Sequence, residues 1–461
     1  MKAKYIKIAV PSIVVLYILF GLVPFMGRAY VSAETRSAFS MENFHGQYMS
    51  PERVMLLEDP QDAFFHRVNL ISNAQEQILL ASFAIRGGTS SDIVIGALLC
   101  AADRGVSVSI INNAVGGQMP SRYLNVLAAH ENIEVYLFNR LELLRPWYIN
   151  SALHDKYMVV DHTFMILGGR NIGDRDFAPD DFTGRVSLDR EVLVYNTDRG
   201  FHGSITAAID YFYSKINSPR TSLSDGVRRS GGWDAEHFIE LFTEYKEGLA
   251  ADDFDYYSNT VQVNRITLIT NSVDTAKNES IVAYNLMMIA QNSDVIIAQS
   301  PYVALTRRNF RTFAETVSDR DFTLLTNSLA STPNLPSFSS YYVSRRNIAR
   351  TGITLYEYQD TQTSIHAKTY LFDGRLVAIG SFNLNERSIR SDTESMLIID
   401  SEEFHDIVFE AINCQISQSL RVTADNNYEP CDYVEAAHVS LGKRALYTTS
   451  GILLRILRFM F

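Results

Sequence analysis

Stretches of strand-length apolar residues alternate with stretches of helical periodicity along most of the chain. In the first half, strands are predicted at 77–85, 106–112 and 133–138, and helices at 91–105 and 123–129. Ser91 or Asp92 can cap the first of these helices, and Gly105 can end it. Strands that alternate with helices predict an α/β fold with a largely parallel sheet.

The same order of elements returns in the second half. Strands are predicted at 294–299, 322–326 and 353–358, and a helix capped by Thr306 follows the first of them. A further apolar run follows in each half, at 153–161 and at 365–373. A duplication of this size predicts two lobes related by a pseudo-twofold axis, each a largely parallel sheet flanked by helices. We place the lobes at 50–200 and 265–425, with bridging helices and loops at 201–264.

The first thirty residues have the pattern of a membrane segment. Ile8–Gly27 contains no charged residue, and Lys2, Lys4 and Lys7 precede it. Twenty helical residues span about 30 Å, the thickness of a bilayer's hydrocarbon core. We expect residues 1–30 to form a transmembrane anchor with a cytoplasmic N-terminus and an exported body. The alternative is a cleaved signal peptide, with Val31–Ala33 as the cleavage site.

The C-terminal residues 440–461 combine apolar and basic side chains. In a helix, one face would carry Ile452, Leu453, Ile456, Leu457 and Met460, with Arg455 and Arg458 turned away. This pattern favours a basic amphipathic tail that lies in an anionic lipid surface. The alternative is a terminal helix docked on the protein's own core.

Composition narrows the class of protein. The chain has 461 residues, of which 46% are hydrophobic, and this is sufficient for two cores. A net charge of −11 argues against nucleic acid as a partner. Cys100, Cys414 and Cys431 lack metal-ligand spacing, so no zinc site is expected. Cys414 and Cys431 could pair in an oxidising compartment or remain thiols.

One group of residues occurs twice with fixed spacing. Each copy has His-x-Lys, then four residues, Asp, six residues, and a glycine-containing segment that ends in Asn. The two copies are His154, Lys156, Asp161, Gly168, Gly169 and Asn171, and His366, Lys368, Asp373, Gly380, Ser381 and Asn383. A single His-x-Lys would carry little weight, but two full copies with equal spacing are a strong signal.

This spacing suits binding of a phosphodiester. Residues two apart on a strand point to one face, so His and Lys emerge together. A turn and a second strand then bring Asn level with them, and the glycines permit close approach of a ligand. Two lobes face to face would surround one phosphate with two imidazoles, two ammonium groups and two amides. Such a site needs no metal and no cofactor.

These motifs resemble those of the phospholipase D superfamily, and in particular the bacterial cardiolipin synthase C type. The resemblance covers roughly residues 60–400 and includes further segments at 101–106, 168–174, 326–330, 365–369 and 379–384. Two positions depart from the family pattern: Asp155 and Asp392 stand where Asn is common. The resemblance implies a phospholipase D fold and a phosphodiesterase or phosphatidyltransferase activity.

The resemblance also implies roles for single residues. His154 would attack phosphorus and become a phosphohistidine, and His366 would act as acid and then base. Lys156, Lys368, Asn171 and Asn383 would bind the phosphate oxygens, with Gly169 and Ser381 beside them. The family pattern pairs each His with a carboxylate of the other lobe: Glu394 with His154, and Asp189 or Glu191 with His366. We expect the motif acids Asp161 and Asp373 to brace the strand and turn.

The resemblance therefore favours a membrane-associated phosphatidyltransferase that forms cardiolipin from phosphatidylglycerol and a second phospholipid. The alternative is a phospholipase D that hydrolyses phospholipids to phosphatidate and alcohol. A superfamily nuclease and a non-catalytic lipid-binding scaffold fit the acidic charge and the intact motifs less well. The expected partners are phospholipid substrates and the bacterial inner membrane, with the body on its exported face. No motif identifies an accessory protein.

Overall fold

The computed structural model describes residues 2–22, 29–224, 235–249, 254–271, 279–455 and 457–460. The side chains of 2–10, 149–150 and 459 lie outside this description. The anchor segment 8–27 is therefore described only in part, and Ile456 of the C-terminal tail lies outside the described residues.

Two large β-sheets organise the molecule. The first has the order β10-β1-β8-β6-β5-β2-β3-β4-β9, and the second has the order β11-β20-β18-β17-β12-β14-β15-β21. The strands of the first sheet are β10 (Val261–Gln262), β1 (Glu52–Leu57), β8 (Glu191–Asn196), β6 (Phe164–Gly168), β5 (Lys156–Val160), β2 (Gln77–Ser82), β3 (Ser107–Asn113), β4 (Ile133–Phe138) and β9 (Thr221–Leu223). Those of the second are β11 (Arg265–Thr270), β20 (Ser395–Asp400), β18 (Leu376–Gly380), β17 (Thr369–Phe372), β12 (Val295–Gln299), β14 (Asp321–Asn327), β15 (Thr354–Tyr358) and β21 (Ser419–Val422).

The two sheets repeat one topology. From β1 to β9 and from β11 to β21, corresponding strands follow one another in the same spatial order. The motif strands β5 and β17 lie centrally in their sheets. Strand β5 lies between β6 and β2, and β17 lies between β18 and β12. This repetition accounts for the duplicated motif.

The prediction of largely parallel sheets is wrong, because both sheets are mixed. Strands β2, β3 and β4 are parallel, as are β12, β14 and β15. The motif strands instead form antiparallel hairpins, β5 with β6 and β17 with β18. A short turn can join only antiparallel neighbours, since a parallel pair needs a crossover. The strand–turn–strand of each motif therefore imposes antiparallel pairing at the centre of each sheet.

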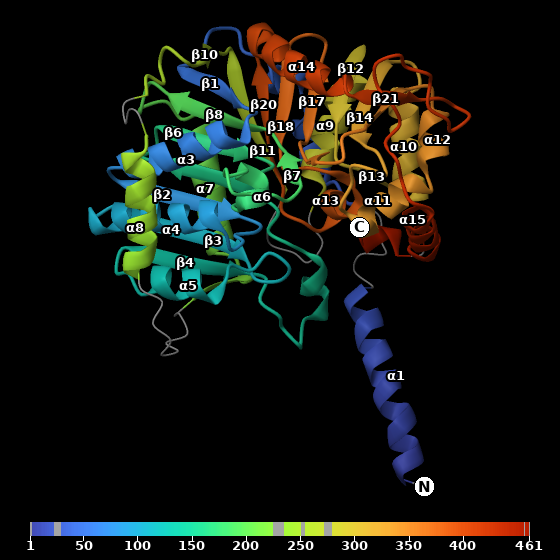
Figure 1. Cartoon of the computed structure of the whole chain (residues 1–461), viewed down its shortest axis with the longest axis horizontal. Helices are drawn as coiled ribbons and strands as arrows, with labels where there is room; N and C mark the ends of the chain where they lie inside the picture. The colour runs from blue at the N-terminus through green and yellow to red at the C-terminus, as the bar shows by residue number, and fades with distance from the viewer. Residues whose placement is uncertain are drawn as a thin grey trace.

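Most helices cover the outer faces of the sheets, and the inner faces pack against each other and against two helices, α7 (Ser204–Ile216) and α14 (Glu402–Ile416) (Figure 1). Between the lobes, one core combines Leu79, Val159 and Leu167 of the first lobe with Leu371, Val377 and Leu397 of the second. The helices are α3 (Pro60–Asn73), α4 (Thr89–Asp103), α5 (Ser121–Ala128), α6 (Asp174–Phe177), α7 (Ser204–Ile216), α8 (Ala235–Glu247), α9 (Ile281–Gln291), α10 (Arg307–Val317), α11 (Leu335–Tyr342), α12 (Arg345–Ala349), α13 (Glu386–Arg390), α14 (Glu402–Ile416) and α15 (Leu441–Leu453).

Segment 201–264, expected to bridge the lobes, also contributes to the first lobe. It contains α7, α8, β9 and β10, and both strands join the nine-stranded sheet. Helix α8 packs on α4, with Phe238 and Phe242 in the outer core of that lobe. The segment thus completes the first sheet before the chain enters β11.

Helix α1 (Lys2–Leu22) projects from the body on the side where the C-terminus also lies (Figure 1). Its contact with the body is made by Phe20, whose ring packs edge-on against Trp147 at 5.4 Å, and by Tyr17, whose hydroxyl donates to the Leu143 carbonyl. Within the described part of the chain, no helix combines the length and the apolarity that crossing a bilayer requires. The transmembrane anchor stays a prediction.

The C-terminal tail is docked on the second lobe, in keeping with the alternative interpretation of this segment. Tyr447 and Gly451 of α15 are buried, the former in the outer core of that lobe. Arg458 donates to the Ser340 carbonyl at 3.2 Å and to Ser344 Oγ at 2.7 Å, so this arginine binds the protein itself. Ile452 and Leu453 remain exposed.

Candidate active site

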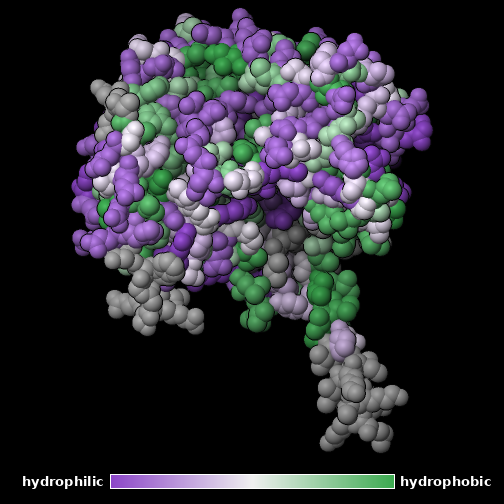
Figure 2. All heavy atoms as spheres, in the orientation of Figure 1, coloured by the Kyte–Doolittle hydropathy of each residue, from purple (hydrophilic) through white to green (hydrophobic). Residues whose placement is uncertain are grey.

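Both motif histidines line one pocket between the lobes. The pocket has a volume of roughly 650 Å³, a size typical of small-molecule sites, and Asn171 and Asn383 line it with His154 and His366. Figure 2 shows this face hollowed near its middle, with hydrophilic residues around the hollow. The structure thus brings together the imidazoles and amides of both copies of the motif.

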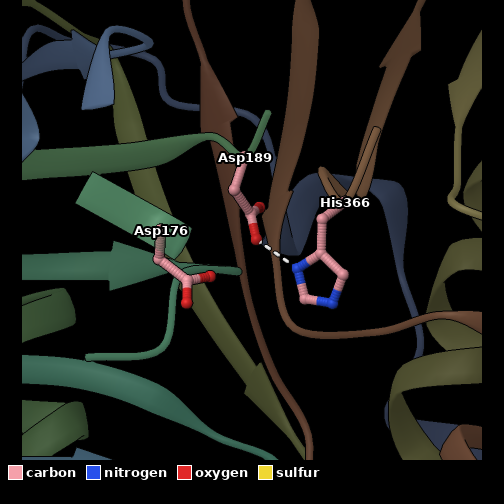
Figure 3. A group of neighbouring side chains, drawn as sticks. All are labelled: Asp176, Asp189 and His366. Carbon is pink, nitrogen blue, oxygen red and sulfur yellow. Dashed lines mark hydrogen bonds and ion pairs between the residues drawn. The ribbon is translucent and has the colours of Figure 1, made fainter. Parts of the chain in front are cut away.

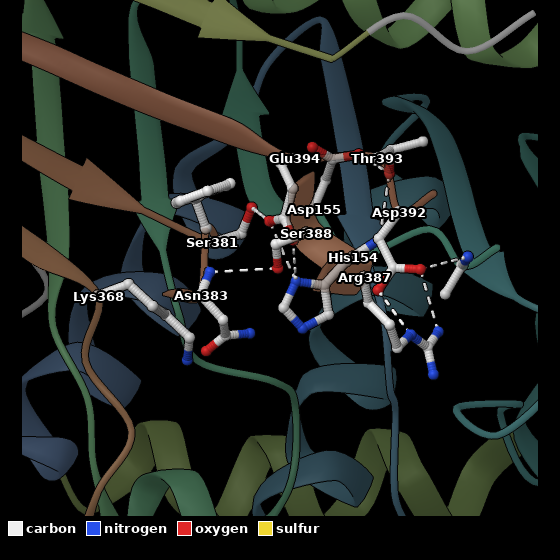
Figure 4. Close-up of polar contacts among 12 residues, drawn as sticks. His154, Asp155, Lys368, Ser381, Asn383, Arg387, Ser388, Asp392, Thr393 and Glu394 are labelled. Atoms are coloured by element: carbon white, nitrogen blue, oxygen red, sulfur yellow. Dashed lines mark hydrogen bonds and ion pairs between the residues drawn. The ribbon is translucent and has the colours of Figure 1, made fainter. Parts of the chain in front are cut away.

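His154 is held by the second lobe. Its Nδ1 lies 3.0 Å from Oε1 of Glu394, a residue whose side chain is fully buried (Figure 4). Its backbone N–H donates to Thr393 Oγ1 at 3.1 Å, and Leu153 forms a β-bridge with Thr393. Since the carboxylate occupies Nδ1, Nε2 is the ring nitrogen left for a substrate.

His366 is held in the corresponding way by the first lobe. Its Nδ1 lies 2.5 Å from Oδ2 of Asp189, and its backbone N–H donates to the Leu188 carbonyl at 2.7 Å. A short parallel pair, β16 (Thr363–Ile365) with β7 (Val186–Leu188), fixes this approach. Of the two acids expected to orient His366, the structure places Asp189 there.

The motif lysines lie beside the histidines. Lys156 Nζ donates to the His154 carbonyl at 2.5 Å, and Lys368 Nζ donates to the His366 carbonyl. Lys368 also lies 3.8 Å from the Asp189 carboxylate. Figure 4 shows the Asn383 side chain between Lys368 and the His154 ring. Among the described residues, the amide oxygens of Asn171 and Asn383 are buried without a hydrogen-bond partner, and both asparagines line the pocket.

Burial controls the protonation of this site. Burial and the charge of Lys368 lower the pKa of Lys156 to about 7. Burial, followed by Lys368, lowers the pKa of His366 to about 3, against the opposing effect of Asp189. Burial and Lys156 hold the pKa of His154 well below its ordinary value. A negatively charged phosphodiester would reverse these shifts, because it favours the protonated form of each base.

The two orienting carboxyls differ. Burial would raise the pKa of Asp189, but Lys368 and His366 lower it below its ordinary value. Burial raises the pKa of Glu394 well above its ordinary value, although Lys156 opposes this. His366 therefore faces a carboxylate that holds its negative charge more firmly than the one facing His154.

Three predicted acids lie away from the pocket. Glu191 binds Arg67 at 2.7 Å and approaches Arg170 at 3.6 Å, so the interpretation of Glu191 as the partner of His366 is corrected. Asp161 accepts backbone N–H groups of residues 75–77, and Asp373 accepts those of Asp294 and Val295. Both have positive φ, 53° and 51°, at the turn after the motif strand. These two contacts tie the turn to the start of the neighbouring strand, β2 or β12.

Gly169 and Ser381, expected beside the substrate, serve the orienting carboxyls instead. A Cβ at position 169 would lie 2.1 Å from Asp189 Oδ1, so glycine makes room for this carboxylate. The Ser381 hydroxyl is fully buried and donates to Glu394 Oε2. Gly169 thus lies against Asp189, which precedes β8, and Ser381 lies against Glu394, which precedes β20.

Sequence reasoning missed a buried network beneath His154. Asp155 forms an ion pair with Lys215 at 3.1 Å, and both side chains are fully buried. The Thr393 hydroxyl also donates to Asp155. Asp392 accepts from the Ala152 N–H at 2.9 Å and from Arg387. The departures from the family pattern at 155 and 392 were the available signal, since a carboxylate in place of an amide implies a cationic partner.

Asp176, Asp189 and His366 place potential metal ligands within 4.8 Å of one another (Figure 3). A cation there would have to displace the hydrogen bond between His366 and Asp189 and would meet Lys368, 3.8 Å from Asp189. The arrangement therefore favours holding a proton on the imidazole over holding a metal ion.

The comparisons with known proteins agree with this geometry. Residues 68–211 and 286–413 match the family model described as "Cardiolipin synthase, PLD-like domain". The chain is 28% identical over 398 residues to cardiolipin synthase C of Escherichia coli K12, covering 76% of this chain and 82% of the relative. It is 27% identical over 393 residues to an uncharacterised Helicobacter pylori J99 protein, covering 76% of each. The crystal structure of phosphatidylserine synthase from Haemophilus influenzae Rd KW20 shares the fold, with a TM-score of 0.66 at 12% identity, over 94% of this chain and all of that one.

The family match covers both copies of the motif and more than half of the chain. The prediction of the phospholipase D superfamily is therefore confirmed, as is that of a phosphodiesterase or phosphatidyltransferase. The chain belongs to the cardiolipin synthase family of phospholipase D-like enzymes.

Proposed function

We propose that this protein transfers a phosphatidyl group from phosphatidylglycerol to the headgroup hydroxyl of a second phospholipid, forming cardiolipin. The observation that carries the proposal is the single pocket lined by His154 and His366, each with Nδ1 bound by a carboxyl of the opposite lobe. Membership of the cardiolipin synthase family supports the choice of substrate.

In the first step, His154 Nε2 attacks phosphorus and a P–N bond forms. The P–O bond to the leaving glycerol breaks, and His366 gives its Nε2 proton to the departing oxygen. Lys156, Lys368 and the two motif asparagines hold the non-bridging oxygens as the geometry at phosphorus inverts. The product is glycerol and a phosphatidyl group on His154.

In the second step, the acceptor hydroxyl gives its proton to His366 and its oxygen attacks phosphorus. The P–N bond breaks, a new P–O bond forms, and both histidines return to their starting states. Water in place of the acceptor would complete hydrolysis by the same route, with phosphatidate as the product.

The difference between the orienting acids supports this assignment of roles. The acid of the first step must hold a proton in the complex, and a firmly ionised partner favours the imidazolium. Asp189 supplies such a partner to His366. Glu394, whose pKa is raised by burial, leaves His154 more readily neutral, as a nucleophile must be.

A membrane-facing surface would bring the pocket to its lipids. Leu141, Leu143 and Leu144 are 61%, 70% and 91% exposed, and they precede Trp147, which packs on Phe20 of α1. Figure 2 shows this apolar loop and α1 on the same side of the body. Arg140 and Arg145 flank the loop, and cations beside apolar and aromatic groups suit a bilayer interface. We place the enzyme on the inner membrane, with the N-terminal segment 1–30 as anchor and the body on the exported face.

Incubation of the purified protein with phosphatidylglycerol vesicles tests the reaction directly. Mass spectrometry of the lipids should detect cardiolipin. The aqueous phase should contain one released glycerol for each cardiolipin formed. Phosphatidate as the main product would instead favour hydrolysis. The variants His154→Ala and His366→Ala, checked for folding by their unfolding transitions, should form neither product.

A further inference from the structure

Three arginines line the active-site pocket, and two of them are neutralised. Arg387 binds Asp392 through two contacts, of 3.0 and 3.1 Å. Arg86 lies 3.6 Å from Asp176. Both guanidinium groups therefore have a carboxylate that offsets their charge before any substrate enters.

Arg175 is the exception. Its Nη2 donates to Ser364 Oγ at 3.2 Å, and its Nε is buried without a hydrogen-bond partner. Across the described residues, no carboxylate forms an ion pair with this guanidinium, whereas Arg86 and Arg387 have carboxylate partners at 3.6 and 3.0 Å. Asp176 and Asp189 act on the charge of Arg175 only from beyond ion-pair distance. A cation that is partly buried in a substrate pocket and forms no ion pair of its own favours an anionic ligand.

The duplication shows that this difference is specific to one lobe. Arg175 follows the motif residue Asn171 by four positions, and Arg387 follows Asn383 by four. The two arginines are thus equivalent in the repeat and enter the same pocket. In the second lobe, Asp392 neutralises the arginine. In the first, the chain after Asn171 follows a longer path to its sheet strand, β8, and supplies no such partner.

The duplicated residues already serve the reacting phosphate. In the proposed mechanism the two motif lysines, asparagines and histidines serve that phosphate, so Arg175, a further cation in the pocket that forms no ion pair, suits a second negative charge. Water as acceptor would bring no such charge. A phospholipid acceptor brings its own phosphodiester, separated from the attacking hydroxyl by the three carbons of its glycerol.

We propose that Arg175 binds the phosphodiester of the acceptor lipid and so directs the phosphatidyl group to a phospholipid headgroup in preference to water or a neutral alcohol. The inference rests on the proposed transfer function and adds to it the residue that recognises the acceptor. A guanidinium suits this role, because its fork of N–H groups matches two phosphate oxygens.

The test compares two soluble acceptors with phosphatidylglycerol as donor. Glycerophosphoglycerol carries the headgroup phosphodiester without acyl chains, and deuterated glycerol has the hydroxyls but no phosphate. The two are supplied at equal concentration, and mass spectrometry measures the ratio of their products. Wild type should prefer glycerophosphoglycerol. Arg175→Gln should lower this preference at least about tenfold, the range for a hydrogen bond to a charged group.

Matched variants separate acceptor recognition from other effects. Arg175→Lys should retain part of the preference, and Arg199→Gln, which removes a cation at an exposed position bound to Glu76, should retain all of it. If Arg175→Gln keeps the wild-type ratio, whatever happens to its total rate, the inference is overturned. A wild type that forms only phosphatidate would overturn the transfer function itself, and the inference with it.

Free phosphate is the other source of the same chemistry. Inorganic phosphate added at the acceptor concentration should leave the wild-type product ratio unchanged if Arg175 recognises the headgroup. A ratio that falls to the Arg175→Gln value would assign the site to free phosphate and contradict recognition of the lipid.

Discussion

Asp189 of the first lobe holds His366 of the second through a contact of 2.5 Å between Oδ2 and Nδ1. The reciprocal contact joins Glu394 of the second lobe to His154 of the first, at 3.0 Å. Each half of the duplicated chain therefore supplies the group that orients the other half's histidine. The lobes act as one site, and neither contains a complete histidine–acid pair by itself.

This relationship predicts that Asp189→Asn will impair catalysis much more than binding. Asparagine has the same shape but lacks the charge that favours the imidazolium, and loss of an orienting carboxylate beside a catalytic histidine costs about a thousandfold or more in kcat. The measurement is kcat and KM for cardiolipin formation in mixed vesicles. The control Asp210→Asn removes an exposed carboxylate from α7 and should behave as wild type. A less than tenfold loss in Asp189→Asn would contradict the role given to this acid.

The buried pair of Asp155 and Lys215 predicts a large effect on stability. Lys215→Met leaves the Asp155 carboxylate buried without its cation, which should lower the free energy of unfolding by about 3–5 kcal/mol. Adding Asp155→Asn to this variant should restore part of the lost free energy of unfolding, because the unpaired charge is removed. Denaturant unfolding followed by circular dichroism measures both. Arg199→Met, at an exposed pair, serves as control and should unfold close to wild type. Equal destabilisation in the single and double variants would show that the charge is unimportant.

The lowered pKa of Lys156 predicts pH-dependent anion binding. In the free protein Lys156, with a pKa of about 7 against an ordinary 10.5, loses its proton as the pH rises above 7. An anion favours the protonated form, so binding takes up a proton and weakens as the pH rises from 7 to 9. Sulfate is a suitable probe because it does not titrate in this range. Calorimetry in two buffers of different ionisation enthalpy should detect the proton uptake. In Lys156→Met the affinity for sulfate should be weaker and nearly constant with pH. If the affinity of this variant falls with pH as steeply as that of wild type, Lys156 is not the group that titrates.

The exposed leucines of the loop before the first motif predict a membrane contact. Leu143→Glu combined with Leu144→Glu should weaken binding to anionic vesicles at least about tenfold, because two apolar side chains leave the bilayer interface and two negative charges enter it. Cosedimentation measures the binding. Ile407→Glu changes an exposed apolar residue of α14, on the side of the body away from α1, and should bind as wild type (Figure 1). Unchanged sedimentation of the double variant would exclude the loop from the membrane surface.

Local sequence patterns predicted the features that depend on neighbouring residues. Strand β4 has the predicted bounds, 133–138, and Thr306 caps α10 through its side chain. The equal spacing of the two motifs predicted that their residues would share one pocket, and both histidines and both asparagines line it.

Features that depend on distant parts of the chain could not be predicted in this way. Helix α4 begins at Thr89, ahead of the expected caps, because Asp174 accepts the backbone N–H groups of Thr89 and Ser90 from another part of the lobe. The antiparallel centre of each sheet follows from the hairpin of the motif, and hydrophobic periodicity does not give the direction in which strands pair. The choice between Asp189 and Glu191 required knowledge of the arginines that bind Glu191.

The central claim is that phosphorus passes through a covalent bond to His154. Rapid acid-free quenching of the wild type during turnover, followed by proteolysis and mass spectrometry at neutral to alkaline pH, measures the adduct directly. The account predicts a phosphatidyl group on the peptide that contains His154 and none on the peptide that contains His366. An adduct on His366, or full turnover by His154→Ala, would contradict it.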